Sequence, residues 1–488
     1  MLTRNCSALI IFDNVHVNMG IFLKGVRWVM YNFRKCVMGL APTRRDVFPD
    51  NRKDEIYSRV KQLAKKHDVE LVTIEDITEE GLLVNNSEVQ KIVNHFRNSG
   101  VDCVFVPHAN FGQEEATAKL CKAVGKPVLL WGPRDPAPKG IVEQMADRLY
   151  DVQCGLFATG RALHSYQVPF TYIENCHIDS PILDSGFEEF VRVACAVRAF
   201  KEARIGQLSV RPWQFLSVKC NESELLEKFG IEVVPFESSV IRGAINDVLT
   251  NDTAAIDAKI KTWKEKLDFS SMPDDTARKT AASVIGIKKL AETHGCTALA
   301  GECWQMLASD FGIASCFVWG ALTDEGLPIT CETDILGAIG SAMLLGAARG
   351  ETSPFFADLT VRHPTNDNAE LLWHCGPFPA SLSKEGSSPS VIGGKGQWEI
   401  KGGDITLVRM GCQNGRYTMF ADECRGTDGP KTNGNYVWIE TDDWPKWERK
   451  FVKGPYIHHI TGAHGKFRKI IHEALQYVGD IHPDSADM

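Results

Sequence analysis

The sequence predicts an α/β protein in which two parallel-sheet domains precede a mixed α+β C-terminal domain. Apolar strands alternate with amphipathic helices in two successive sets, a pattern typical of parallel sheets covered on both faces. The pattern changes after residue 295, where helices are followed by short runs of alternating polarity that predict further β-strands. A chain of 488 residues is also too long for one compact core, so several domains are expected.

The elements of the first two domains follow from periodicity and from turn residues. In the first domain, apolar runs predict strands at 36–42, 69–75, 101–108 and 127–135. Helical periodicity predicts helices between them at 53–67, 88–100 and 110–125. The second domain repeats the alternation, with elements predicted at 187–203 (helix), 204–210 (strand), 222–230 (helix) and 231–237 (strand).

Changes in this pattern of strands and helices predict the domain boundaries. Residues 1–35 are an N-terminal extension to which we assign no role, and 36–165 form the first domain. The second domain covers 166–295, including charged helices predicted at 251–295, and the C-terminal domain covers 296–488. Within this last domain the glycine- and serine-rich stretch 383–398 is predicted to be a loop, and 397–423 to contain strands.

Composition and charge exclude several classes of protein. The 62 acidic and 54 basic residues are interspersed and give a net charge of −8, which argues against nucleic acid as the main partner. The 15 cysteines are scattered without a CxxC pair, as is typical of a reduced, cytoplasmic protein. Charged residues interrupt the apolar segment 8–33, so we expect neither a membrane span nor a secretory signal.

The stretch from 327 to 376 carries the strongest chemical signal. Glu332, Asp358 and His374 each follow an apolar run, so strands would deliver them to one edge of a sheet. Two carboxylates and an imidazole are suitable ligands for a divalent metal. The two residues after Glu332 have a simpler possible role, because Thr333 or Asp334 could cap the helix that follows.

The late histidines leave alternatives open. His458, His459 and His464 could form a zinc site, but they lack the helical HExxH spacing and bring no cysteine. They could equally be solvated, or His464, between glycine-containing turns, could reach Glu332 and Asp358 as a third metal ligand. Cys331 and Cys375 flank the proposed ligands, and we expect buried free thiols there rather than nucleophiles.

These motifs resemble a known family. CWQMLASDFGIASC, DEGLPITCETDILGAIG, FFADL, LLWHCGPFP and TGAHG resemble the C-terminal domain of the L-fucose isomerase and L-arabinose isomerase superfamily. GLAPTRRDVF, VPHANFGQEEA and VLLWGPRD resemble the first domain of its shorter, fucose-isomerase-like members. The resemblance covers residues 36–488. The chain departs from true L-fucose isomerases in being shorter and in having Cys-Glu-Thr-Asp where they have Thr-Glu-Asn-Asp, which bears on the sugar rather than on the chemistry.

The resemblance implies an aldose–ketose isomerase with three domains, the first two Rossmann-like, one Mn²⁺ per site, and a trimer or hexamer in which a neighbour completes the site. It assigns the metal ligands to Glu332, Asp358 and His464, and it places His374 where arabinose isomerases have a second histidine. The metal would polarise the sugar carbonyl while Glu332 and Asp358 serve as base and acid. The sugar would be a free pentose or 6-deoxyhexose.

Further residues are predicted to bind the sugar. Trp304 could stack on its apolar face, and His374 could bind a hydroxyl group instead of the metal. Arg44, His108 and Asn110, at predicted strand ends of the first domain, could cover the sugar of a neighbouring subunit. Two other functions stay open: a sugar-binding protein of the same fold without activity, and an isomerase of a modified, for example sulfonated, sugar.

Overall fold

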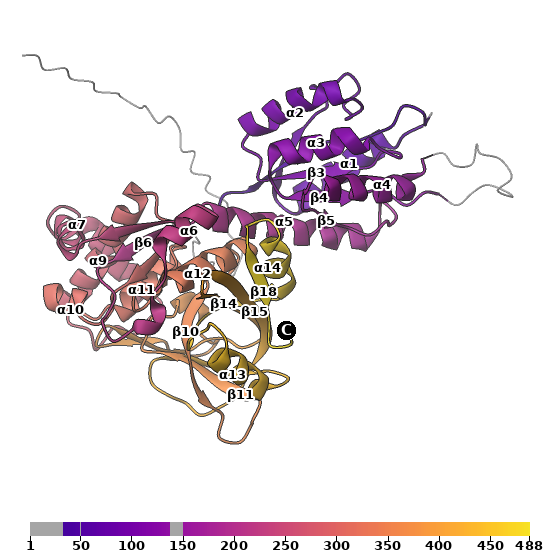
Figure 1. Cartoon of the computed structure of the whole chain (residues 1–488). Coiled ribbons are helices and arrows are strands. Elements are labelled where there is room, and N and C mark those ends of the chain that lie inside the picture. Colours follow the sequence, from indigo (N-terminus) through magenta and orange to yellow (C-terminus); the bar gives the residue numbers. More distant parts are fainter. Residues whose placement is uncertain (1–32, 49, 137–149) are drawn as a thin grey trace, which may run out of the picture.

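The predicted fold class is confirmed by a computed structural model that describes residues 33–48, 50–136 and 150–488. Two parallel sheets with covering helices lie in the first two thirds of the chain, and a mixed sheet follows (Figure 1). The predicted N-terminal extension falls almost wholly outside the described residues.

The first sheet has the strand order β2-β1-β3-β4-β5, and all its pairings are parallel. Its strands are β1 (Cys36–Leu40), β2 (Val69–Thr73), β3 (Cys103–Pro107), β4 (Val128–Trp131) and β5 (Thr171–Tyr172). Its helices are α1 (Lys53–Lys66), α2 (Asn86–Asn98), α3 (Glu114–Val124) and α4 (Val152–Ser165). Strands β1, β3 and β4 are buried throughout, which explains why they are apolar at every position.

A long helix, α5 (Pro181–Lys201), joins this domain to the rest of the protein (Figure 1). Ser180 caps its start by accepting the backbone N–H of Ile182, and Pro181 occupies the first turn, where its missing N–H costs nothing. The helix packs against β1 at one end and against helices of the C-terminal half along its length.

The second sheet has the order β7-β6-β8-β9 and is also entirely parallel. Its strands are β6 (Arg204–Leu208), β7 (Glu232–Phe236), β8 (Ala298–Gly301) and β9 (Ile329–Thr330). The helices around it are α6 (Glu222–Phe229), α7 (Ser238–Asn251), α8 (Thr253–Lys264), α9 (Asp274–Thr293), α10 (Met306–Phe311), α11 (Cys316–Asp324) and α12 (Ile335–Ala347). Strands β8 and β9 follow residue 295, so this sheet extends beyond the boundary we placed there.

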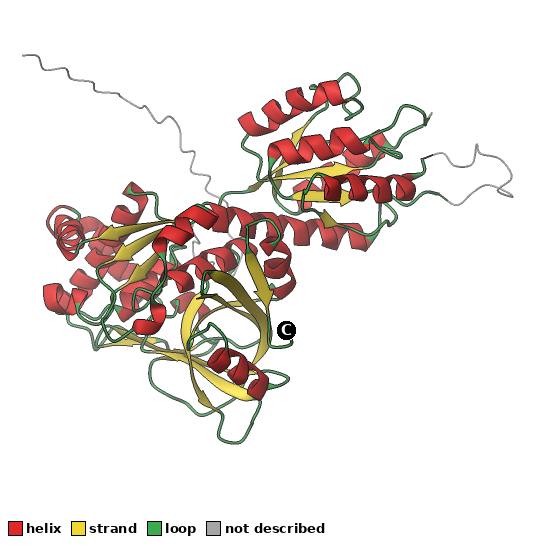
Figure 2. Cartoon of the chain, viewed as in Figure 1, coloured by secondary structure: helices red, strands yellow, loops and turns green. Residues whose placement is uncertain are grey.

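The third sheet has nine strands in the order β12-β13-β16-β11-β10-β17-β14-β15-β18. An additional pairing of β15 with β16 closes the strands from β16 to β15 into a ring, drawn in yellow in Figure 2. The elements are β10 (Phe355–Arg362), β11 (Ala369–His374), β12 (Ser390–Ile392), β13 (Lys395–Glu399), β14 (Asp404–Gln413), β15 (Arg416–Thr427), β16 (Asn435–Glu440), α13 (Trp444–Lys453), β17 (His459–His464), α14 (Arg468–Leu475) and β18 (Ile481–Asp484).

Two expectations for this region are corrected. The predicted loop 383–398 contains β12 and most of β13, which form a hairpin around Gly393 and Gly394, and its glycines serve that turn. Asp358 lies within β10 rather than at the end of a strand, because β10 continues to Arg362. In the part of the chain that the structure describes, no helix combines the length and apolarity needed to cross a membrane.

Helix α12 ties the three sheets together. It starts directly after β9, packs against β8 and β14, and also lies along α5. Its contact with α5 is close at Gly346, where an added Cβ would lie 2.7 Å from both the Cβ of Ala199 and the carbonyl oxygen of Cys195. Glycine is therefore required there for packing.

This close approach predicts opposite effects of two identical substitutions in one helix. Gly346→Ala would force α12 away from the α5 backbone and should destabilise the protein by about 1–3 kcal/mol. At Gly340 an added Cβ meets only Val408, at 3.7 Å, so Gly340→Ala should be neutral or stabilising, by up to about 1 kcal/mol, through helix propensity. Thermal unfolding of both variants tests this, and a Tm for Gly346→Ala equal to or above that of the parent contradicts the packing argument.

Candidate active site

Glu332 lies in a strained turn between β9 and α12. Its φ angle is 51° and that of Thr333 is 60°, both in the left-handed region that a β-branched residue such as threonine rarely adopts. Such residues cost about 1–3 kcal/mol each and cluster at functional sites. The turn is held by two hydrogen bonds: Thr333 N–H donates to the Gly301 carbonyl at 3.1 Å, and Asp334 N–H donates to the Cys331 carbonyl at 3.1 Å.

Asp334 caps α12, as predicted, by accepting the backbone N–H of Gly337 at 3.0 Å. It also forms a buried ion pair with Arg409 of β14 and a 3.0 Å hydrogen bond with Nδ1 of His459. Burial alone would raise the pKa of Asp334, but the charge of Arg409 and the contact with His459 outweigh it and hold the pKa well below its usual range. Asp334 is therefore a carboxylate.

This ionised carboxylate fixes the orientation and tautomer of His459. Because Asp334 can only accept, Nδ1 of His459 carries the proton and donates it to the hydrogen bond. The neutral ring then presents the lone pair of Nε2, which is the form that binds metal ions. A carboxylate behind a ligating histidine is a recurrent arrangement in metal sites.

His459 Nε2 faces two carboxylates. It lies 3.6 Å from Oε2 of Glu332 and 3.6 Å from Oδ1 of Asp358, which pairs with His459 across β10 and β17. Both carboxylate oxygens are buried without a hydrogen-bond partner among the described residues. By contrast, the neighbouring buried acid Glu302 uses its two oxygens to accept backbone N–H groups at the start of α10.

These observations support a divalent cation at this point. Buried carboxylate oxygens without donors are costly, and a cation would neutralise them. Two oxygens and one imidazole nitrogen form a suitable donor set for Mn²⁺ or a similar ion. His458, whose Nε2 is 4.0 Å from Oδ1 of Asp358, forms a group of possible ligands with Asp358 and His459, whereas Glu332 also lies close to the thiols of Cys303 and Cys331.

The structure corrects the assignment of His464. His459 and His464 lie at the two ends of β17, about 16 Å apart and on opposite faces of the strand. Nε2 of His464 contacts the Lys401 carbonyl at 2.7 Å and its ring lies against Phe355. Burial lowers its pKa to about 4. The histidine beside Glu332 and Asp358 is therefore His459, not His464.

His374, the last residue of β11, lies at the edge of the same site. Its ring is 6.1 Å from that of Phe356, which in turn contacts the ring of His459 at 4.9 Å. Nδ1 accepts the backbone N–H of Cys375 at 2.9 Å, so in the neutral ring Nε2 carries the hydrogen. Nε2 is buried and has no partner among the described residues. This tautomer suits donation to a substrate oxygen better than metal binding.

Aromatic rings form one side of the site. Trp304, which is 44% exposed, donates from Nε1 to Oε1 of Glu332 at 3.2 Å, and Cys303 approaches the same oxygen at 3.2 Å. Phe215 stacks on His459 at 5.7 Å and meets Trp304 edge-on at 5.4 Å. The structure thus places Trp304 and His374 beside Glu332 and Asp358, and their binding of a sugar stays a prediction.

The sequence prediction missed Phe215, the position of His459 and the contacts of Asp334 with Arg409 and His459. The adjacent His458–His459 pair, at the start of an apolar run, was a signal that could have identified His459.

Arg44, His108 and Asn110 lie elsewhere, at the carboxyl ends of β1 and β3. The strand order reverses between these two strands, and ligands of such sheets bind at that point. Asn110 hydrogen-bonds to the backbone of the surrounding loops. Arg44 pairs with Glu80 at 2.7 Å. His108 contacts the Phe111 carbonyl through Nδ1 at 2.8 Å, and its Nε2 has no partner among the described residues.

This edge of the first domain faces away from the rest of its own chain. The C-terminal part contacts the first sheet at the opposite edge, where Tyr477 donates to the carbonyl of Val128 at the start of β4. Figure 1 shows the first domain set apart from the ring of strands. Within one chain, therefore, Arg44, His108 and Asn110 do not join Glu332.

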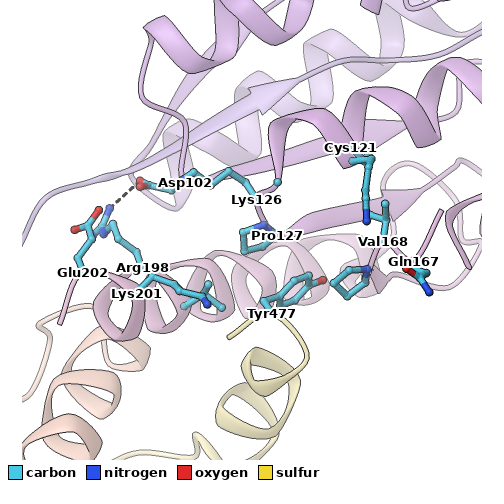
Figure 3. A pocket seen from close by; sticks show the side chains of 14 residues that line it. Asp102, Cys121, Lys126, Pro127, Gln167, Val168, Arg198, Lys201, Glu202 and Tyr477 are labelled. Carbon is cyan, nitrogen blue, oxygen red and sulfur yellow. Dashed lines mark hydrogen bonds and ion pairs between the residues drawn. The ribbon is translucent and has the colours of Figure 1, made fainter. Parts of the chain in front are cut away.

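A cavity of about 490 Å³ lies at that opposite edge, between the first sheet, α5 and Tyr477 (Figure 3). Its buried charges are already paired, as in the 2.8 Å contact of Asp102 with Arg198. It contains none of the predicted ligands, so we do not place the active site there.

Comparisons with known proteins agree with this picture. The family model described as the N-terminal domain of fucose/sulfoquinovose isomerases matches residues 39–201. The sulfoquinovose isomerase of Priestia aryabhattai is 24% identical over 341 residues, covering 68% of this chain and 74% of that protein. The sulfoquinovose isomerase of Alkalicoccus urumqiensis is 24% identical over 350 residues, covering 70% and 76%. The chain is therefore similar to the fucose-isomerase-like family, and these comparisons indicate an aldose–ketose isomerase.

Proposed function

We propose that this isomerase converts a sulfonated aldose, of the sulfoquinovose type, to its ketose at the site formed by Glu332, Asp358 and His459. The observation that supports this site most directly is the pair of buried carboxylate oxygens that face Nε2 of His459 and have no hydrogen-bond partner among the described residues. The curated relatives named above support the sugar class. The free pentose or 6-deoxyhexose that the sequence favoured is the second candidate.

The same three atoms, Oε2 of Glu332, Oδ1 of Asp358 and Nε2 of His459, are proposed to hold Mn²⁺ or another divalent cation. When bound, such a cation acts as a Lewis acid on the carbonyl group of the sugar. Asp334 keeps His459 in the tautomer that can bind it, and Arg409 keeps Asp334 ionised. The site thus holds the ligands in position before the cation arrives.

The residues of the chain are proposed to carry the proton transfer and the orientation of the sugar. Isomerisation removes a proton from C2 and returns one to C1, and Glu332 and Asp358 lie on either side of His459, close enough to serve adjacent carbons. His374 donates from Nε2 to a sugar oxygen. Trp304 and Phe215 cover the apolar C–H face and exclude water from it.

We also propose that another copy of the chain completes the site in a homo-oligomer. The segment that carries Phe215 also exposes large apolar side chains: Val210 is 73%, Trp213 82% and Leu216 70% exposed. Clustered apolar exposure marks contact surfaces. The first domain of a neighbouring copy could bring Arg44, His108 and Asn110 to the opening of the site beside Phe215. The positive charge of Arg44 would suit a sulfonate there. The free thiols of the described residues support a cytoplasmic location.

A panel of aldoses tests the substrate. Purified protein with Mn²⁺ should form ketose from sulfoquinovose faster than from L-fucose, L-arabinose or glucose. Glu332→Gln should lower kcat at least about 100-fold, because it removes a carboxylate from the proton transfer. Glu440→Gln, the same change on an exposed residue of β16, should retain activity. Faster turnover of an unmodified sugar would favour the second candidate, and an active Glu332→Gln would refute the role of Glu332.

Metal titration distinguishes the two histidines of β17. After chelation, His459→Ala should bind Mn²⁺ at least about 10-fold more weakly than the parent, because a ligand is lost. His464→Ala removes an imidazole from the same strand and should bind Mn²⁺ as the parent does. Isothermal titration of each variant measures both affinities. A larger loss in His464→Ala than in His459→Ala would restore the original assignment.

The oligomer is tested at its exposed apolar segment. Trp213→Glu should shift the protein to a smaller mass in light scattering and lower activity, because a charge would be buried against the neighbouring copy. Val452→Glu, at an equally exposed position on α13 (78%), should change neither. A parent protein that is active as a monomer would contradict the proposal.

A further inference from the structure

Two cysteines that the proposed chemistry does not use lie beside the site. Cys316 begins α11 and Cys375 follows β11, and their Sγ atoms are 3.2 Å apart. This is closer than unbonded sulfur atoms normally approach, and a disulfide bond would bring the sulfurs to about 2.05 Å. A movement of about 1 Å would therefore join them.

Cys375 is coupled to His374 by two contacts. Its backbone N–H donates to Nδ1 of His374 at 2.9 Å, and its Sγ lies 3.3 Å from the same nitrogen. These contacts fix the tautomer of His374 and aim Nε2 at the site. Cys316 contacts the sulfur of Cys375. A change at Cys316 therefore reaches His374 through Cys375.

We propose that Cys316 and Cys375 form a reversible disulfide bond when a hydroperoxide oxidises them, and that this bond lowers isomerase activity by displacing His374. Only the loss of activity rests on the proposed function; the bond itself does not.

The reaction balances with hydrogen peroxide as the oxidant. The hydrogen bond from Cys375 lowers the pKa of Cys316, which favours its thiolate as the first nucleophile. Its sulfur attacks one peroxide oxygen, the O–O bond breaks, and a sulfenic acid forms while the leaving hydroxide takes up a proton to become water. The sulfur of Cys375 then displaces the hydroxyl group, which leaves as a second water with the Cys375 proton. The two thiols lose two electrons, and the peroxide gains them.

Other cysteine pairs serve as comparisons within the chain. Cys36 and Cys103 lie 3.8 Å apart in the core of the first sheet and are 1% and 0% exposed, so peroxide should not reach them. Cys303 and Cys331 approach each other near Glu332, but Cys331 is 1% exposed and lies next to the strained turn. Cys375 is only partly buried and Cys316 is 5% exposed, so the proposed pair is more open to peroxide than Cys36 and Cys103 are.

Peptide mapping tests the bond directly. The full-length protein is treated with hydrogen peroxide, its remaining thiols are alkylated, and disulfide-linked peptides are identified by mass spectrometry. We expect a Cys316–Cys375 link that dithiothreitol removes. Its absence, or a Cys303–Cys331 link in its place, overturns the proposal, whether or not the protein turns over a sugar.

Activity measurements test the consequence. Peroxide should lower the turnover of the parent several-fold, and dithiothreitol should restore it. Cys316→Ser should keep its activity under peroxide, whereas Cys103→Ser, a matched change in the other close pair, should be inhibited like the parent. Equal inhibition of the parent and Cys316→Ser would show that the bond does not control activity. If no aldose is converted at all, the proposed function fails while the mapping still decides the bond.

Discussion

The buried contact of Asp334 with His459 and Arg409 is the interaction on which the site depends. Asp334 is 0%, His459 1% and Arg409 3% exposed, so each would be costly without the others. The contact joins the start of α12 to strands β14 and β17 and therefore fixes the parallel sheet against the ring of strands. It also determines which nitrogen of His459 faces the two carboxylates. The contact of Asp334 with His459 and Arg409 thus determines both the packing of the two sheets and the chemistry of the site.

The site lies at the junction of two sheets rather than within one sheet. Glu332 comes from the end of a parallel strand, whereas Asp358 and His459 face each other across two antiparallel strands. The left-handed backbone at Glu332 and Thr333 turns the chain sharply enough for the acid to reach that pair. The backbone at Glu332 is strained, and none of the residues that the structure describes donates a hydrogen bond to its Oε2. Both features indicate a residue placed for function rather than for stability.

Much of the fold was predictable because hydrophobic periodicity determines which elements form. Strands such as β3 and β4, which are apolar at every position, predicted a parallel sheet. Glu332 and Asp358 could be recognised as candidate ligands because each is an acid that follows an apolar run. The proposed third ligand was missed because His459 and His464 lie on one short strand, and only the register with β10 shows which of them faces Asp358. Phe215 was missed because it lies in an irregular segment whose position periodicity does not determine. The domain boundaries and the roles of Arg44, His108 and Asn110 stay predictions.

One divalent cation is proposed to lie between Glu332, Asp358 and His459. Anomalous diffraction from crystals grown with Mn²⁺ tests it most directly, because the signal locates the ion without reference to activity. We predict a single strong peak within about 2.5 Å of Oε2 of Glu332, Oδ1 of Asp358 and Nε2 of His459. A peak beside His464, or one held by Cys303 and Cys331 without Asp358, would contradict the account.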